Sequence, residues 1–136
     1  MKDISRDIIG AAIEVHKILG PGLLEMCYEV ALEHELKLRG HQVSRQGEVP
    51  IFYKGVNLSR TGKDEVLLRY DLVVDDCLVI ELKSVEELKP VHFKQLKTYL
   101  HFLEIPVGLL FNFNVSNLMK EGFGRVVLGF EGEVGV

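Results

Sequence analysis

The sequence predicts an α/β fold in which helices flank a mixed central sheet, in the order αβββαβ. Three observations predict it. Apolar residues recur at three- and four-residue steps through most of residues 4–38, as they do in amphipathic helices. Two β-rich runs then flank a short acidic turn, as in a hairpin. A further helical period is followed by an apolar run of strand length.

Apolar periodicity predicts the first two helices. Residues 4–19 follow a helical period until Gly20-Pro21-Gly22 breaks it. The period resumes over residues 23–38, and Gly40 is a favourable residue just beyond a helix end. The apolar positions that define this second helix are Leu23, Leu24, Cys27, Val30, Ala31, Leu36 and Leu38.

The middle of the chain predicts strands. Residues 42–53 have extended character, and Lys54-Gly55 turns the chain. Residues 66–74 and 78–83 are rich in β-branched and aliphatic side chains, with Asp75-Asp76 between them. These two runs therefore predict a hairpin.

The last third of the chain predicts a helix followed by a buried strand. Pro90 suits the first turn of a helix, residues 91–103 follow a helical period, and Pro106 ends it. Residues 107–113 are apolar throughout, which is typical of a strand covered on both faces. Residues 126–130 predict a final edge strand.

Length and composition are those of an ordinary globular chain. The 136 residues are 47% apolar and 26% charged, which predicts a single domain over residues 1–136. No run approaches the roughly 18 apolar residues of a membrane span, and the N-terminal residues lack the apolar core of a secretory signal. Cys27 and Cys77 lie in apolar runs without a CxxC motif, so we expect buried free thiols and a cytoplasmic location.

The charge balance argues against a strongly basic, non-specific nucleic-acid binder. The net charge is −4. The charge is uneven, however, because residues 39–69 carry six basic and three acidic side chains. This block is the one part of the sequence suited to contact with a phosphate backbone.

The predicted hairpin carries the candidate chemistry. If a three-residue loop joins its strands, Asp71 pairs with Glu81 and their Cβ atoms lie roughly 5 Å apart. A two-residue loop would put the two acids on opposite faces. Two carboxylates this close repel unless a positive charge lies between them, and a hard cation such as Mg²⁺ prefers such oxygen ligands. Lys83 shares a face with Glu81, where it could orient or help deprotonate the attacking water.

A plainer interpretation of this pattern stays open. Asp71, Glu81 and Lys83 could form a solvated polar face with a salt bridge, as most arbitrary D…ExK patterns do. Three features favour a site instead. The charges sit within very apolar strands, the hairpin brings them together, and further motifs lie on either side.

Those further motifs lie along the chain within a stretch of roughly residues 4–128 over which the resemblance described next extends. They are Gly22-Leu-Leu-Glu25-Met-Cys-Tyr28, Tyr53-Lys-Gly-Val, Asp71-Leu-Val-Val, Val79-Ile-Glu81-Leu-Lys83, Gln95-Leu-Lys-Thr-Tyr99 and Gly108-Leu-Leu-Phe-Asn112-Phe. Together they resemble the GxxExxY protein family of the PD-(D/E)XK nuclease-like superfamily. The resemblance implies a restriction-endonuclease-like αβββαβ core, in agreement with the order predicted from periodicity.

The resemblance implies a role for each residue of the candidate metal site. Asp71 and Glu81 match the metal-binding acids, and Lys83 matches the catalytic lysine. Glu25 matches an acidic residue of the first core helix that reaches the metal or its water shell. The backbone carbonyl of Leu82 is a further candidate ligand.

The resemblance also implies substrate contacts. Gln95 and Tyr99 match a Q-x-x-x-Y motif that lies beside the site and the nucleic-acid path, and their spacing puts them on one helical face. Tyr28 is a further candidate for substrate contact, with packing as the alternative. Residues 58–66 form a longer stretch than in a typical member, which we expect to be a mobile loop near the site whose Arg60 and Lys63 touch phosphate.

The implied function is hydrolysis of phosphodiester bonds in nucleic acid with Mg²⁺ or Mn²⁺, and DNA is the expected substrate. Two alternatives remain open: a catalytically inactive nuclease-fold module for binding or interaction, and a subunit of a larger nucleic-acid-processing assembly. A chain of this length leaves specificity to short loops, to a second protomer in a homodimer, or to a protein partner.

Overall fold

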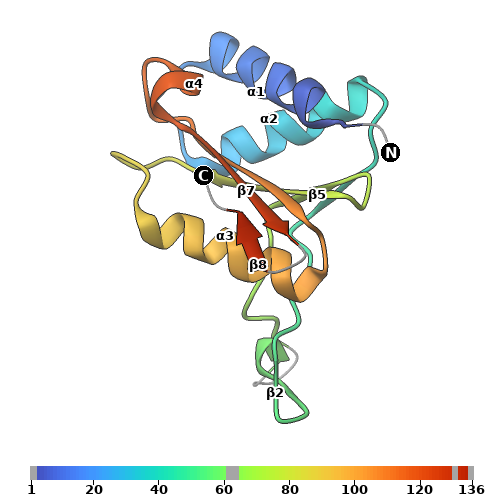
Figure 1. Cartoon of the computed structure of the whole chain (residues 1–136). Helices are drawn as coiled ribbons and strands as arrows, with labels where there is room; N and C mark the ends of the chain where they lie inside the picture. Colours follow the sequence, from blue (N-terminus) through green and yellow to red (C-terminus); the bar gives the residue numbers. More distant parts are fainter. Residues whose placement is uncertain (1–2, 61–64, 130–131, 135–136) are drawn as a thin grey trace.

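The computed structural model describes residues 3–60, 65–129 and 132–134. A central sheet is covered by α1 and α2 on one face and by α3 on the other (Figure 1). The elements are α1 (Ser5–Leu19), α2 (Glu25–Leu38), β1 (Val43–Arg45), β2 (Phe52–Tyr53), β3 (Val56–Asn57), η1 (Leu58–Arg60), β4 (Leu72–Val74), β5 (Leu78–Lys83), α3 (Pro90–Leu103), β6 (Val107–Asn112), α4 (Leu118–Glu121), β7 (Phe123–Gly129) and β8 (Gly132–Val134). No helix of the described residues is long and apolar enough to cross a membrane.

The sheet has six strands in the order β1-β4-β5-β6-β7-β8. Strands β5 and β6 are parallel, and the other neighbours are antiparallel. Helix α3 provides the crossover that the parallel pair requires. The elements α2, β1, β4, β5, α3 and β6 form the predicted αβββαβ core, so the restriction-endonuclease-like fold class is confirmed.

Alternating side chains of the strands supply two separate cores. On β5, Ile80 and Leu82 point toward α1 and α2, where they join Phe111 and Phe113. Val79 points toward α3 and packs with Leu96 and Leu100. Because successive strand residues face opposite sides, Glu81 and Lys83 share the α3 side with Val79.

Helix α3 lies close to the sheet at two glycines. A Cβ atom on Gly108 would lie 2.8 Å from the Leu96 Cδ1 atom, and one on Gly124 would overlap the Phe93 ring. No real Cβ atom tolerates such approaches without a shift of its neighbour. The absence of side chains on β6 and β7 at these positions therefore sets the height of α3 above the sheet.

The second predicted helix is present as α2, but of the apolar positions that predicted it only Leu36 is buried. The buried residues are Tyr28, Glu29, Leu32 and Leu36, whereas Leu24, Cys27, Val30 and Leu38 are exposed. Tyr28, Leu32 and Leu36 lie on the side of the helix that faces the core. Cys27 lies on the other side and is therefore at the surface. Both cysteines are free, as predicted, but the predicted burial was wrong, because Cys27 is exposed and Cys77 is partly exposed.

The strand predictions were right for β5 and β6 but differ elsewhere. Of the predicted run 66–74, only β4 joins the main sheet, although Arg69 forms an isolated bridge with Glu48. The last predicted strand is β7, which starts at Phe123 and so earlier than the predicted residue 126. It was expected at the edge of the sheet, but it is not an edge strand because β8 pairs with it. Phe130, the predicted end of that strand, lies outside the described residues. The short α4 was not predicted.

Candidate active site

The hairpin of β4 and β5 brings the two predicted acids together. Val74 pairs with Leu78 and Leu72 with Ile80, which confirms the three-residue loop and sets Asp71 opposite Glu81. The Asp71 N–H donates a hydrogen bond to Glu81 Oε1 at 2.9 Å. The Leu82 N–H donates to Asp71 Oδ2 at 2.7 Å. Each carboxylate therefore accepts a hydrogen bond from a backbone N–H. For Glu81, this N–H belongs to Asp71.

Burial makes this pair of acids unusual. Asp71 is 8% exposed and Glu81 is 3% exposed. Burial raises the pKa of Asp71 above its ordinary value, and the negative charges of Glu29 and Glu25 add to the effect against the Leu82 N–H. Burial and the charge of Asp71 raise the pKa of Glu81 in the same way. Without a cation, the structure thus favours protons on this pair near neutral pH.

Lys83 begins a chain of hydrogen bonds that leads to α3. Its Nζ donates to Gln95 Oε1 at 3.1 Å, and Gln95 Nε2 donates to the Tyr99 hydroxyl at 3.2 Å. Tyr99 is almost fully buried, and this burial and the nearby charge of Glu81 raise the pKa of its hydroxyl. Gln95 and Tyr99 lie on one face of α3, as their spacing predicted, and hydrogen bonds connect both of them to Lys83.

Glu25 approaches the site from the other side of the sheet as the first residue of α2. The Ser84 hydroxyl donates to the Leu23 carbonyl at 2.8 Å, which joins the end of β5 to the start of this helix. Burial raises the pKa of Glu25, while the charge of Lys83 and the Ser84 N–H oppose the shift. The carboxylate therefore lies close enough to Lys83 to interact with its charge.

Two residues of the site were missed in the sequence. Glu29 is 3% exposed and accepts hydrogen bonds from Arg45 at 2.9 Å and from Gln46 Nε2 at 2.8 Å. The same Gln46 nitrogen donates to Asp71 Oδ1 at 3.2 Å. Glu29 follows Glu25 by one helical turn, and that spacing could have identified it. No local pattern marks Gln46, because it reaches the site from a different element.

Tyr28 lies beneath the site rather than in it. Its side chain is fully buried and stacks on Phe113, with 4.6 Å between ring centroids. Its hydroxyl donates to the Gly20 carbonyl at 2.6 Å and accepts from the Leu23 N–H at 3.0 Å. These contacts hold the turn that precedes Glu25, and full burial does not agree with the substrate contact expected for Tyr28.

Asn112 fastens the segment that follows Lys83. Its Oδ1 accepts the Val85 N–H at 3.1 Å, and its Nδ2 donates to the Val85 carbonyl at 2.9 Å. Both bonds are made by a fully buried side chain at the end of β6. Asn112 thereby fixes the course of the chain just beyond the catalytic lysine expected from the sequence.

The donors present suit a hard divalent cation. Asp71, Glu81 and Glu25 offer carboxylate oxygens, and a bound cation would stabilise the charged form of the first two against burial, which raises their pKa values. Within the described parts of the chain, no three His, Cys, Asp or Glu side chains are grouped to hold a metal ion. Mg²⁺ is commonly bound through only one or two carboxylates, with waters and substrate phosphate as its other ligands.

A restriction-endonuclease-like fold that pairs Asp71 with the Glu81-Leu82-Lys83 segment defines a nuclease-like class of protein. The chain belongs to the PD-(D/E)XK nuclease superfamily, whose family model matches residues 2–126. Comparisons with curated proteins and with solved structures found no match. Membership suggests nuclease activity and implies nucleic-acid binding, and nucleases of this superfamily typically use divalent metals.

Proposed function

We propose that the protein hydrolyses phosphodiester bonds in nucleic acid with the help of Mg²⁺ or Mn²⁺, and that DNA is its substrate. The observation that carries the proposal is the buried pair of Asp71 and Glu81, with Lys83 two residues farther along the same strand face. A solvated polar face would leave these carboxylates exposed and their pKa values close to ordinary. Burial of two acids costs stability, and functional sites are where proteins commonly accept such a cost.

The acids have the proposed role of metal ligands. Asp71 and Glu81 would hold the cation, with the Leu82 carbonyl as a further ligand and Glu25 as a direct or water-mediated one. When bound, the cation supplies positive charge that stabilises the negative charge developing on the phosphate and the leaving oxygen. The carboxylates must lose their protons for this role, which makes cation binding compete with protons at the pair.

Lys83 has the proposed role of positioning the attacking water. Its ammonium group is held by Gln95, so the lysine is aimed by α3 rather than free to rotate. Tyr99 completes the chain by its hydrogen bond with Gln95. In this proposal the exposed side of Gln95 and the neighbouring surface of α3 guide the substrate strand.

The surface of α3 suits a phosphate backbone. The helix carries Lys94 and Lys97 and has no Asp or Glu within Pro90–Leu103, and Lys89 precedes its first residue. Residues 1–38, which carry seven acidic and four basic residues, include α1 and α2 on the opposite face of the sheet (Figure 1). The net charge of −4 is therefore compatible with an anionic substrate at the α3 face.

We place the chain within the GxxExxY family of the superfamily as part of the same proposal. The G-x-x-E-x-x-Y motif occupies Gly22–Tyr28. Two observations support the proposal: Glu25 is close enough to Lys83 for the two charges to interact, and the Tyr28 hydroxyl bonds the turn that precedes Glu25. We also assign the activity to the cytoplasm.

The deciding experiment measures metal binding and cleavage separately. We expect purified protein to bind Mn²⁺ by calorimetry and to cleave DNA when Mn²⁺ or Mg²⁺ is added. Asp71→Asn and Glu81→Gln keep an acceptor for the hydrogen bonds from Leu82 and Asp71 but remove the charge, so each should abolish both results. Glu87→Gln, at an exposed position, is the matched control. Cleavage that persists in Glu81→Gln would sink the assignment.

A catalytically inactive nuclease-fold module for binding or interaction is the second candidate, favoured by the acidic net charge. A stand-alone nuclease gains affinity from basic residues along the phosphate backbone, and in this chain 20 acidic residues outnumber 16 basic ones. Mn²⁺ binding without cleavage would support a subunit that acts within a larger assembly. Absence of Mn²⁺ binding in the folded wild-type protein would support the inert module.

A further inference from the structure

A two-stranded arm projects from the body beyond α3 (Figure 1). We define the arm as residues 47–60 and 65–70, which include β2, β3 and η1. It is a hairpin of its own, because Phe52 pairs with Asn57 and Tyr53 with Val56 in a separate two-stranded sheet. An ion pair of 2.8 Å between Arg60 and Glu48 and a bond from Asn57 to Glu48 at 3.0 Å stiffen it from within.

The arm is rooted at the candidate active site. The Gln46 N–H donates to the Asp71 carbonyl at 2.9 Å, and the Tyr70 N–H donates to the Gly47 carbonyl at 2.9 Å. The Tyr70 ring covers Gly47 so closely that no side chain fits there. The arm thus continues the pairing of β1 and β4 outward, and its two strands leave the sheet next to Asp71.

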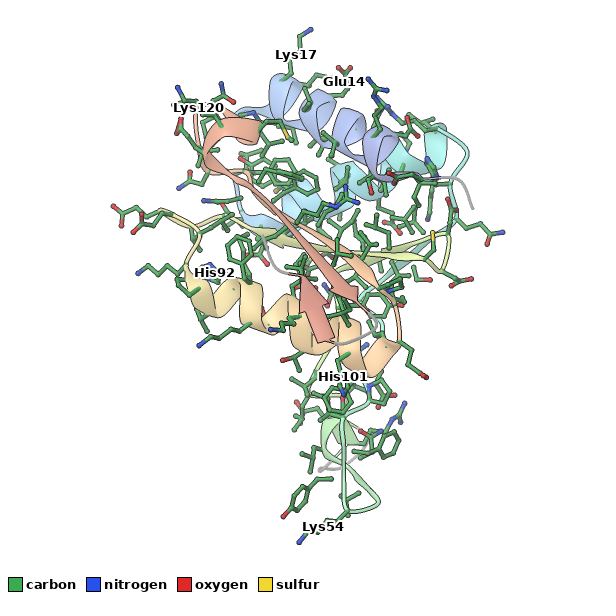
Figure 2. The ribbon with its side chains drawn as sticks, viewed as in Figure 1. Glu14, Lys17, Lys54, His92, His101 and Lys120 are labelled. Carbon is green, nitrogen blue, oxygen red and sulfur yellow. The ribbon has the colours of Figure 1, made fainter. Side chains whose placement is uncertain are left out.

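The distal part of the arm exposes side chains that globular proteins usually bury. Phe52 is 60% exposed, Tyr53 is 58% exposed and Val56 is 55% exposed. Neighbouring strand residues point to opposite faces, so each face of the hairpin carries one aromatic ring. The arm stands clear of the body, and Lys54 lies at its tip (Figure 2).

A positive charge lies beside one of these rings. Lys54 Nζ lies 5.4 Å from the centroid of the Tyr53 ring. The two aromatic residues have no acidic neighbour in residues 49–60, and the carboxylate of Glu48, nearer the root, is engaged by Arg60. Exposed rings beside a cation are what proteins use to bind single-stranded nucleic acid, because every base has a face that can stack.

We propose that the arm binds unpaired bases of a nucleic-acid strand, which stack on Phe52 and Tyr53 while Lys54 contacts phosphate. The strand is thereby led along the arm to Asp71. This inference rests on the proposed function, and it names the substrate class as nucleic acid with a single-stranded segment. A duplex would instead need a broad basic surface, and within its described residues the arm has one cation, Lys54, at its tip.

The test measures binding without cleavage. Fluorescein-labelled oligo(dT) of 12 nucleotides is titrated with the full chain in chelator, and anisotropy is recorded at several salt concentrations. Phe52→Ala with Tyr53→Ala should weaken binding at least about tenfold. Lys54→Ala should reduce the dependence of the logarithm of affinity on the logarithm of salt concentration by about one. Ile18→Ala, which trims an apolar side chain 70% exposed on α1, is the matched control and should bind like wild type.

Several outcomes would overturn the inference. One is equal affinity of the double variant and wild type, with both folded by circular dichroism. Another is equally arm-dependent binding of a blunt duplex. A third is that wild type sediments as a dimer and the double variant as a monomer, because the rings would then bind a second copy of the chain. If wild type cleaves and the double variant binds and cleaves as well as wild type, only the inference is refuted. If wild type binds the oligonucleotide more tightly than the double variant does but never cleaves, only the nuclease proposal is refuted.

Discussion

The backbone N–H of Asp71 donates to a carboxylate oxygen of Glu81 across the β4–β5 hairpin, at 2.9 Å. One acid therefore orients the other through its main chain, while its own side chain accepts the Leu82 N–H. The geometry of the pair depends on backbone that also forms the centre of the sheet. For this reason we expect substitutions of the neighbouring side chains to alter chemistry more than folding.

Removal of the Lys83 ammonium group tests its role directly. Lys83→Ala should reduce metal-dependent cleavage at least about a hundredfold, because the water loses its positioning group. Mn²⁺ binding by calorimetry should remain. Gln95→Ala should cost about tenfold, since the lysine remains but loses its 3.1 Å partner. Lys120→Ala on α4 is the control, and a Lys83→Ala enzyme as active as this control contradicts the role.

Gln46 is expected to position the metal-binding acids. Its amide bridges Glu29 and Asp71, and its backbone has a positive φ of 56° that asparagine also tolerates. Gln46→Asn therefore preserves the backbone but shortens the bridge. We expect Mn²⁺ affinity to fall about ten- to a hundredfold with little change in melting temperature. Gln42→Asn is the matched control, and unchanged Mn²⁺ affinity in Gln46→Asn would refute the positioning role.

His41 makes the stability of the fold depend on pH. Its Nε2 faces Asp7, and its Nδ1 faces Asp75 at 2.7 Å, an arrangement that only the doubly protonated ring satisfies. Burial alone lowers the pKa of His41, but the hydrogen bonds to Asp7 and Asp75 outweigh it and the pKa is raised. The stabilisation is therefore fully present below the unfolded value near 6.5 and is lost as pH rises through the higher folded value.

Denaturation of wild type and His41→Asn across pH 5.5–8.5 measures this contribution. We expect the variant to be less stable by about 1 kcal/mol at pH 5.5, a modest figure because Asp7 is partly exposed. The gap should close as pH rises. His34→Asn, on the outer part of α2, should show no such change. A gap that widens with pH would contradict the assignment.

Tyr28 is expected to stabilise the start of α2 through its hydroxyl. Tyr28→Phe keeps the ring stacked on Phe113 but removes the bonds with Gly20 and Leu23. The free energy of unfolding should fall by about 1 kcal/mol because two partly buried hydrogen bonds, to the Gly20 carbonyl and from the Leu23 N–H, are lost. Urea denaturation measures the loss, with the exposed Tyr53→Phe as control. Equal stability of the two variants would show that the hydroxyl is dispensable.

The parts of the fold that were predicted correctly depend on local chemistry. Strand β5 alternates apolar and charged residues on one short run, α3 begins at Pro90, and an acidic pair marks the turn before β5. The rotation of α2 was not predictable in the same way. Its apolar residues occur on more than one side, and only the packing of Tyr28 and Leu32 against the sheet selects the inward stripe.

In the candidate site, too, the contacts within one hairpin were predictable and the contacts between elements were not. Asp71, Glu81 and Lys83 come together through one hairpin, so a count of loop residues was enough to predict their pairing. Gln46 reaches Asp71 from the end of β1, and Glu29 reaches it through Gln46. Such contacts join three elements that are distant in sequence, and no spacing within one element reports them.

The two glycines beneath α3 have a consequence for the reaction itself. Gln95 lies on that helix and bonds to Lys83 on the sheet. The distance between the helix and the sheet, which is short at Gly108 and Gly124, therefore also affects how far apart these two side chains lie. A methyl group at either glycine would require the Leu96 or Phe93 side chain to shift, and both belong to the helix that carries Gln95. Two residues without side chains therefore help to set the surroundings in which Gln95 meets the proposed catalytic lysine.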